Sequence, residues 1–221
     1  MNTRQVAVSV VLVVAFVFGG WSPAGAGVAT EQLRPAMDEI VRIANDLALK
    51  APAMRQMRRA AIRRVLEDMT DFEEAARRAL GPYWRERNPA ERVEFVGLFS
   101  ELVLLSYTAN IDVFSREKTA HLDLFFGEKV SYLGELTEDG AATVRTRIVR
   151  RDRPDVPVDY RMHAIGTRWL VYDVIVEGAS MVANYRAQFH AIIKTASYSE
   201  LVTRIRARVV ELTIPAPLAA R

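Results

Sequence analysis

The sequence predicts an α+β fold in which a four-stranded antiparallel sheet packs against N-terminal and C-terminal helices and encloses an apolar cavity. Apolar residues recur at helical spacing as far as about Tyr107, alternate with polar residues between 129 and 177, and return to helical spacing near 178. Only turn segments interrupt the alternating region, as in an antiparallel meander. One face of such a sheet meets amphipathic helices, and a cavity commonly lies between them.

Residues 1–26 are typical of an export signal. Arg4 gives a basic start, residues 6–18 are almost entirely apolar, and Ala24-Gly25-Ala26 fits a signal-peptidase site. A membrane anchor is the alternative, but the apolar run ends at Gly19-Gly20 and a membrane span needs ~18 or more apolar residues. We therefore expect export to the periplasm and cleavage after Ala26.

The remaining chain, residues 27–221, has the length of a single domain, with a loose tail from about residue 213. The sequence contains no cysteine, which excludes disulfides, thiol catalysis and thiolate metal sites. The formal net charge of +3 is too small to indicate a nucleic-acid partner.

The first two predicted helices have simple start signals. Thr30 is the expected N-cap of the first helix, and Pro52 begins the second. One face of the second helix is predicted to be apolar, and it consists of Met54, Met57, Ala61, Val65 and Met69.

The next two helices have stronger capping patterns. Asp71 and Glu74 form a capping box, and Gly81-Pro82 ends this short third helix. In the segment 88–91, an asparagine cap precedes a proline at the first helical position, and a glutamate follows three residues after the cap. The fourth helix is expected to reach about Tyr107.

Four strands follow, with period-2 alternation in most of them. They are predicted at residues 129–136, 142–149, 156–165 and 168–177. The fourth strand is apolar on both faces, which favours a central or covered position. Two closing helices are expected near 178–195 and 198–212.

The sequence contains one candidate for a catalytic group. The three histidines are scattered, and the sequence has neither a G-x-S-x-G elbow nor a glycine-rich phosphate loop. Asp173, or Asp159, beside Tyr160 could act as a general base if an apolar pocket desolvated the carboxylate. The structural alternative is that Asp173 pairs with an arginine such as Arg186 and orients the joint between strand and helix.

Residues 55–64 carry five arginines and no acidic residue. Arg55, Arg59 and Arg63 recur at helical spacing and share one face. This face is either an ordinary solvated surface or a docking surface for an acidic partner or an anionic membrane.

A resemblance to a known family rests on segments spread over about residues 35 to 205. They include Gly81-Pro-Tyr-Trp84, Val158-Asp-Tyr160, Glu177-Gly178 and Asn184-Tyr-Arg186. Together they resemble the MlaC family of periplasmic phospholipid-binding proteins, also described as toluene-tolerance auxiliary components of an ABC transporter. A branch of this family associated with hopanoid gene clusters shares the pattern.

The resemblance implies a monomeric, non-enzymatic carrier in the periplasm. It would shuttle phospholipid, or a related lipid such as a hopanoid, between an outer-membrane lipid complex and an inner-membrane ABC transporter complex. The lipid is its cargo, and no cofactor, metal or nucleic acid is expected. Arg55, Arg59 and Arg63 become candidates for docking on these complexes.

The lipid cavity is expected between the sheet and the helices. Its candidate lining residues are Phe99, Leu102, Tyr107, Val144, Ile148, Val158, Tyr160, Met162, Val182, Tyr185 and Phe189. The alternative function is a small cone-fold periplasmic enzyme that uses Asp173 and Tyr160 on an apolar substrate.

Overall fold

The computed structural model describes residues 27–108, 129–150 and 154–213, apart from the side chains of Lys50, Pro52 and Tyr107. The predicted export signal and the tail beyond residue 213 lie outside these residues.

Helices and strands follow one another in the predicted order. The helices before the sheet are α1 (Val28–Asn45), α2 (Arg55–Met69), α3 (Phe72–Leu80) and α4 (Pro89–Thr108). Short 3-10 turns at Ala48–Lys50, Pro52–Met54 and Gly81–Glu86 connect some of them. The strands are β1 (Lys129–Glu138), β2 (Ala141–Val149), β3 (Val156–Ile165), β4 (Arg168–Val176) and β5 (Ala179–Ser180). The closing helices are α5 (Met181–Thr195) and α6 (Tyr198–Thr213). The α+β class is confirmed.

The prediction of four strands is wrong, because the described sheet has five antiparallel strands in the order β1-β2-β3-β4-β5. Glu177 and Gly178 both have positive φ, at 50° and 84°, which reverses the chain tightly after β4. Ala179 and Ser180 then pair with the end of β4 before α5 begins. Two residues are too few to produce an alternating pattern, so β5 has no signal in the sequence.

The predicted capping box at Asn88 and Glu91 is confirmed, whereas only the Asp71 half of the other box forms, because the Asp71 N–H donates to the Val171 carbonyl at 2.8 Å. The Asp71 carboxylate accepts a 2.9 Å hydrogen bond from the Glu74 N–H at the start of α3. At the start of α4, the Glu91 N–H donates to the Asn88 side chain and the Asn88 N–H donates to the Glu91 carboxylate, at 3.0 and 2.9 Å. The start of α4 is thus fixed by local bonds alone, whereas the start of α3 is also held by contacts of Asp71 with Val171 and His163.

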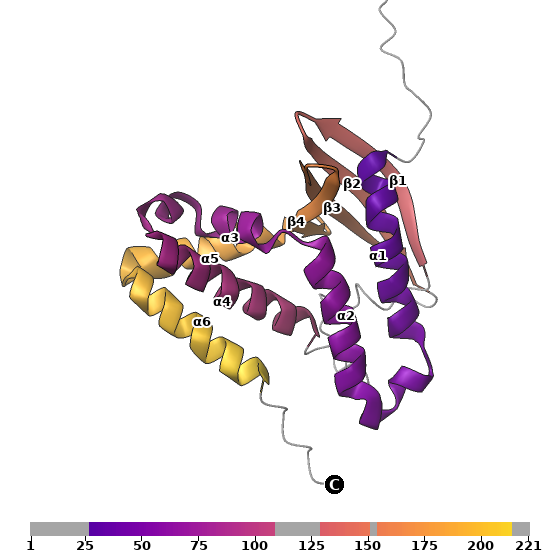
Figure 1. The fold of residues 1–221 in the computed structure, drawn as a ribbon, viewed down its shortest axis with the longest axis horizontal. Coiled ribbons are helices and arrows are strands. Elements are labelled where there is room, and N and C mark those ends of the chain that lie inside the picture. The colour runs from indigo at the N-terminus through magenta and orange to yellow at the C-terminus, as the bar shows by residue number, and fades with distance from the viewer. Residues whose placement is uncertain (1–26, 109–128, 151–153, 214–221) are drawn as a thin grey trace, which may run out of the picture.

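The buried face of α2 differs from the predicted methionine stripe. Met57 is 58% exposed, whereas Ile62 is fully buried against Ile43 of α1. The packing of α2 beside α1 selects this face, because α2 runs back along α1 to form an antiparallel hairpin (Figure 1).

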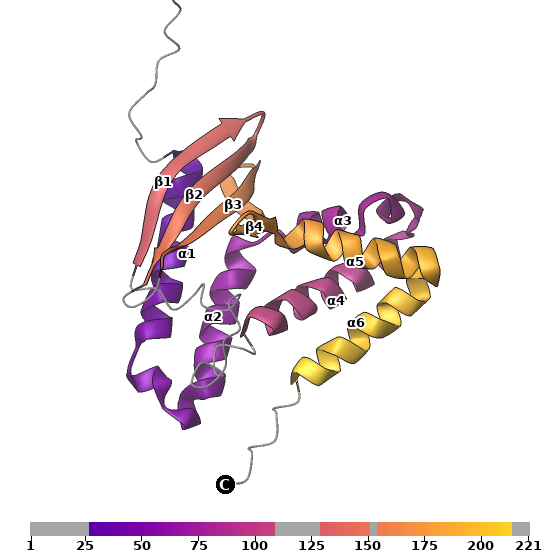
Figure 2. The same ribbon diagram turned by 180° about the vertical axis from the view of Figure 1, so that it is seen from behind.

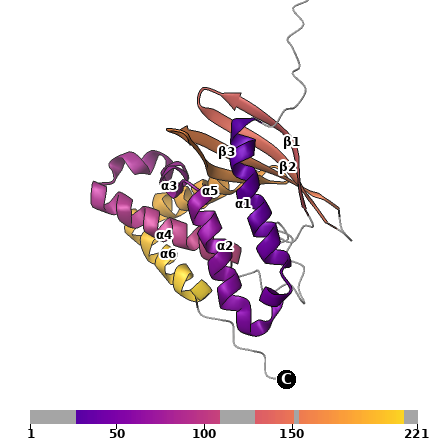
Figure 3. The same ribbon diagram turned by 45° about the vertical axis from the view of Figure 1, so that its right-hand side comes forward.

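The described residues form two large apolar clusters rather than one. In the first cluster, α1 lies across one face of the sheet (Figures 1 and 3), and Leu33, Met37 and Ile40 pack on the inward-facing strand residues. In the second cluster, α3, α4, α5 and α6 pack on one another through residues such as Phe95 and Leu201. The molecule therefore has a sheet lobe and a helical lobe, and β4 leads from one to the other (Figure 2).

A strand residue caps the first helix. The helix begins at Val28 after an N-cap at Gly27, so the prediction that Thr30 is the cap is wrong. The N–H and the hydroxyl of Thr30 donate instead to the Glu135 carboxylate on β1, at 2.7 and 2.6 Å. Burial disfavours the charged carboxylate, but hydrogen bonds from Thr30, Thr137 and Ala29 outweigh it and hold the pKa of Glu135 below its usual range.

We expect Glu135→Gln to lower the free energy of unfolding at neutral pH by about 1 kcal/mol, as for the loss of a helix cap. The folded pKa lies below the unfolded value of about 4.3, so the stabilisation is complete above that pH and is lost as pH falls through the folded pKa. Urea unfolding at neutral and acidic pH measures the difference, with the exposed Glu138→Gln as control. A difference between wild type and E135Q that grows on acidification would contradict this role.

Candidate functional site

Two cavities of the described residues share a wall, and the larger lies among α4, α5, α6 and the ends of β4 and β5. Its volume is about 550 Å³, within the ~300–1,000 Å³ that small-molecule sites usually occupy. Helices α5 and α6 meet at their connecting turn and diverge towards the sheet, with α4 beside them (Figure 2). The cavity is thus bounded by three helices and a sheet edge.

The lining of this cavity changes from apolar to polar. The buried part consists of Leu102, Phe189, Leu201 and Ile205, with exposures of 6% or less. The exposed part includes Asn184, Gln188, Arg204 and Arg208. A cavity with an apolar, buried floor and a polar mouth suits an amphiphilic molecule.

Aromatic rings stiffen the wall of the cavity. Phe99 meets Tyr185 and Phe189 edge to face, with ring centroids 5.3 and 6.0 Å apart. Phe95 packs in the same way on Phe189, at 5.8 Å. Such edge-to-face contacts hold the rings in defined positions.

A second cavity of about 60 Å³ lies where α2, α4 and β4 meet. Its lining is nearly all apolar and includes Leu66, Phe72 and Val103. Val174 and Met181 border both cavities, so their side chains form the wall between them. A methionine side chain can change shape at low cost, which makes this wall deformable.

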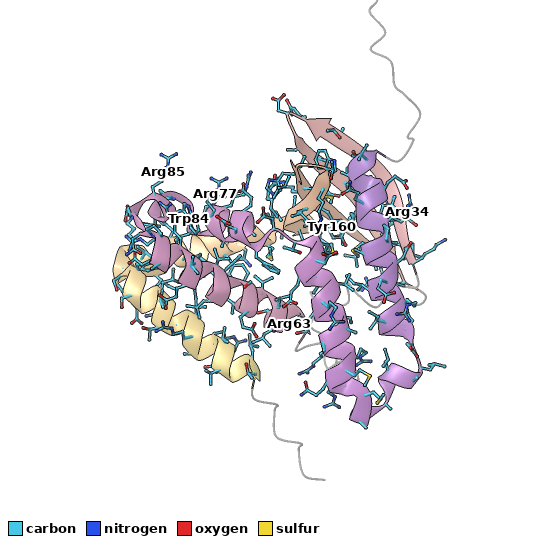
Figure 4. The ribbon with its side chains drawn as sticks, viewed as in Figure 1. Arg34, Arg63, Arg77, Trp84, Arg85 and Tyr160 are labelled. Atoms are coloured by element: carbon cyan, nitrogen blue, oxygen red, sulfur yellow. The ribbon has the colours of Figure 1, made fainter. Side chains whose placement is uncertain are left out.

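Some of the predicted lipid-binding residues line these cavities. Leu102, Tyr185 and Phe189 border the larger cavity, and Tyr160 borders the smaller one. Figure 4 shows Tyr160 at the junction between the sheet and the N-terminal helices.

The other predicted lipid-binding residues lie elsewhere. Phe99 and Val182 are buried in the core of the helical lobe. Tyr107 belongs to α4, but its side chain lies outside the described part of the structure. The four sheet residues border neither cavity, because α1 covers them, and they are Val144, Ile148, Val158 and Met162.

The predicted lining residues include Tyr185 and Phe189 of α5 but none of α6. Ile192 on α5, and Leu201 and Ile205 on α6, form much of the apolar lining. Leu201 and Ile205 are spaced four residues apart, which indicates an inward face for α6. The sequence therefore contains a signal for the inward face of α6, but it does not indicate which elements pack on that face.

Asp173 joins β4 to the start of α5. Its carboxylate accepts hydrogen bonds from Arg161, the Ser180 hydroxyl and the Val182 N–H, at 3.2, 2.7 and 3.0 Å. The predicted pairing with an arginine is confirmed, but the partner is Arg161 and not Arg186. Both carboxylate oxygens of Asp173 are therefore occupied.

Arg186 has a different role from the one predicted. Its Nε donates to the Arg78 carbonyl at 2.9 Å, which ties α5 to the end of α3. The chain turns at Gly81 with a φ of 62°, close beside the Arg186 side chain. The residue four positions after Arg78 is Pro82, which has no N–H, so Arg186 supplies a donor to this carbonyl at the helix end.

The arginine face of α2 is only partly available to a partner. Arg63 binds Glu101 of α4 through two hydrogen bonds of 2.9 and 2.6 Å and also binds Glu67, as its position between the two helices in Figure 4 suggests. The hydrogen bond with Glu101 raises the pKa of Arg63 further above its ordinary value. Arg55 is exposed and Arg59 is half-buried.

Comparison with known proteins assigns the family. A profile of the MlaC protein family matches residues 34–207. The chain belongs to the MlaC family. This member also shares its fold with a phospholipid-binding protein from Ralstonia solanacearum that was solved in complex with a phospholipid. The TM-score is 0.68 at 21% identity, and the alignment covers 84% of this chain and 99% of that one.

Two further observations concern the described residues of this MlaC-family protein. None of its described helices is both long and apolar enough to cross a membrane. Within the same residues, no group of three or more histidine, aspartate or glutamate side chains is arranged to hold a metal ion.

Proposed function

We propose that this MlaC-family protein is a periplasmic lipid carrier that holds acyl chain in the cavity among α4, α5 and α6. The observation that carries the proposal is the lining of that cavity, which is apolar and buried at its floor and polar at its mouth. Leu102, Phe189 and Leu201 would contact the acyl chain. The Ralstonia solanacearum protein of similar fold, which was solved with a phospholipid, supports the same function.

The small cavity offers a place for the end of a longer chain. It continues beyond Val174 and Met181, which border both cavities. A rotamer change of Met181 would connect them and lead the chain towards Tyr160, where the helical lobe meets the sheet.

Energetics determine how the cargo leaves. Burying acyl chain is worth about 0.8 kcal/mol per methylene, so a chain of about fourteen methylenes gains roughly 11 kcal/mol relative to water. Relative to a bilayer most of this gain cancels, because the lipid is equally well buried there. Transfer would therefore take place in contact with an inner-membrane ABC transporter complex and an outer-membrane lipid complex, and not through free solution.

Mass spectrometry under denaturing conditions tests the function directly. Freshly purified mature protein, secreted after cleavage at Ala26, is expected to contain stoichiometric lipid and to keep it through dialysis. The alternative of an enzyme that uses Asp173 and Tyr160 predicts an empty cavity and a processed substrate. Protein without lipid, or rapid loss of lipid to buffer, would contradict the carrier function.

Docking on the membrane complexes is proposed to use the arginine face of α2. The test uses the double variant Arg55→Glu/Arg59→Glu and keeps Arg63, because reversing Arg63 would also break its ion pair with Glu101 between α2 and α4. This variant should slow lipid transfer to liposomes that contain the partner complexes, and high salt should reduce the difference from wild type. Arg64→Glu, on the opposite side of the same helix, is the matched control. Equal transfer rates for wild type and the double variant at low salt would show that the arginine face is an ordinary solvated surface and does not dock on the complexes.

A further inference from the structure

Two arginines lie at the mouth of the larger cavity. Arg204 and Arg208 are spaced four residues apart on α6, so they lie on the same side of the helix, and both border the cavity. No aspartate or glutamate is among the lining residues. The lining as described therefore contains two positive charges and no negative charge.

Both arginines are free to exchange partners. Arg204 pairs with Glu200 at 2.7 Å and Arg208 with Glu211 at 2.8 Å, each within α6. The side chains of Arg204 and Arg208 are 58% and 59% exposed. Exposed ion pairs of this kind are weak, and an anionic group that is held in place from below can replace the carboxylates.

Neutral polar groups complete the mouth. Ser106, Asn184 and Gln188 border the cavity together with the two arginines. Burial raises the pKa of Tyr185, while a hydrogen bond with Ser106 and the charge of Arg208 oppose that rise. The charge of Arg208 therefore acts on Tyr185, and both side chains border the cavity.

We propose that Arg204 and Arg208 bind the phosphate of the cargo's head group and make the protein selective for phospholipids with a net negative charge. A guanidinium matches a phosphate with two parallel hydrogen bonds, whereas it gains nothing from an uncharged polycyclic lipid such as a hopanoid. A zwitterionic phospholipid has the same phosphate, but its ammonium group brings a positive charge close to the two arginines, and this repulsion lowers the affinity for such lipids. The proposal rests on the proposed carrier function and names the lipid class that the cavity prefers.

A competition between two lipids tests the selectivity. Mature protein is loaded from vesicles of equimolar phosphatidylglycerol and phosphatidylcholine with identical acyl chains, and mass spectrometry gives the ratio of bound lipids. Wild type should favour phosphatidylglycerol by up to about tenfold, since two exposed charge contacts contribute little each. The ratio should fall to about one in Arg204→Gln/Arg208→Gln, and it is compared per molecule of bound lipid so that a change in total loading does not affect it.

The matched control is Arg42→Gln. Arg42 forms a similar ion pair with Glu39 within α1 and borders neither cavity. The ratio of bound phosphatidylglycerol to phosphatidylcholine in this variant should equal that of wild type. Inorganic phosphate added at the lipid concentration should not change the ratio, because a free anion lacks the acyl chain that holds the head group in place. Displacement by inorganic phosphate would indicate an anion site independent of lipid.

The outcomes separate the two proposals. Absence of any lipid in wild type contradicts the carrier function itself. Bound lipid with a ratio near one in wild type, or a double variant that keeps the wild-type ratio, overturns the arginine site alone. Preferential loading of an uncharged polycyclic lipid from mixed vesicles also overturns it. If the double variant is poorly folded, the salt dependence of the wild-type ratio decides, because the preference should shrink in 1 M salt, where the screening length is only ~3 Å.

Discussion

Replacing Asp173 with alanine should lower the free energy of unfolding by about 3 kcal/mol, the lower end of the range for removing one partner of a buried charge pair. The Asp173 side chain is only 2% exposed, whereas Arg161 is 45% exposed and can be hydrated when its partner is lost. The Ser180 hydroxyl and the Val182 N–H would also lose their acceptor at the start of α5. Because this joint lies between the two lobes, the helical lobe should detach more readily from the sheet.

Urea unfolding at neutral pH measures this loss. Asp159→Ala is the matched control, since Asp159 lies on the neighbouring strand β3 and is half-buried. Surface changes of this kind usually alter stability by about 0.5 kcal/mol or less. Similar losses in both variants would show that the hydrogen bonds of Asp173 do not hold the joint.

Replacing Ala179 with tryptophan should abolish most lipid loading while leaving the fold intact. Ala179 lies on β5, borders the larger cavity and is exposed, so the substitution fills space without removing any core contact. Overfilling an occupied site typically costs about 1–3 kcal/mol, which corresponds to a roughly tenfold or greater loss of bound lipid.

The control for this variant is Ala187→Trp on α5. Ala187 is also exposed but does not border the cavity. The lipid content of both proteins is measured by mass spectrometry under denaturing conditions, and thermal unfolding verifies the fold. Full loading of a folded A179W protein would show that acyl chain does not occupy the cavity among α4, α5 and α6.

The sequence by itself determined those parts of the structure that depend on interactions between residues close together in the chain. The reciprocal bonds between Asn88 and Glu91 follow from a motif of four residues, and the structure has them as predicted. The meander from β1 to β4 likewise follows from alternation and from turn residues such as Gly140 and Gly166, which both have positive φ. Segments such as Gly81-Pro-Tyr-Trp84 were also sufficient to indicate the family.

Which apolar surfaces meet was decided only by the tertiary structure. The sequence marks Val144 and Leu102 as equally apolar, yet α1 covers the first and the second borders a cavity among the helices. The same holds for polar groups, since Glu135 caps α1 across 105 positions of sequence. The hydrophobic effect has no preferred direction. A stripe of apolar side chains therefore predicts that this face will be buried, but it does not predict which other element will cover it. The division into two cores, and with it the position of the cavity, therefore follows from how the helices pack on one another and on the sheet.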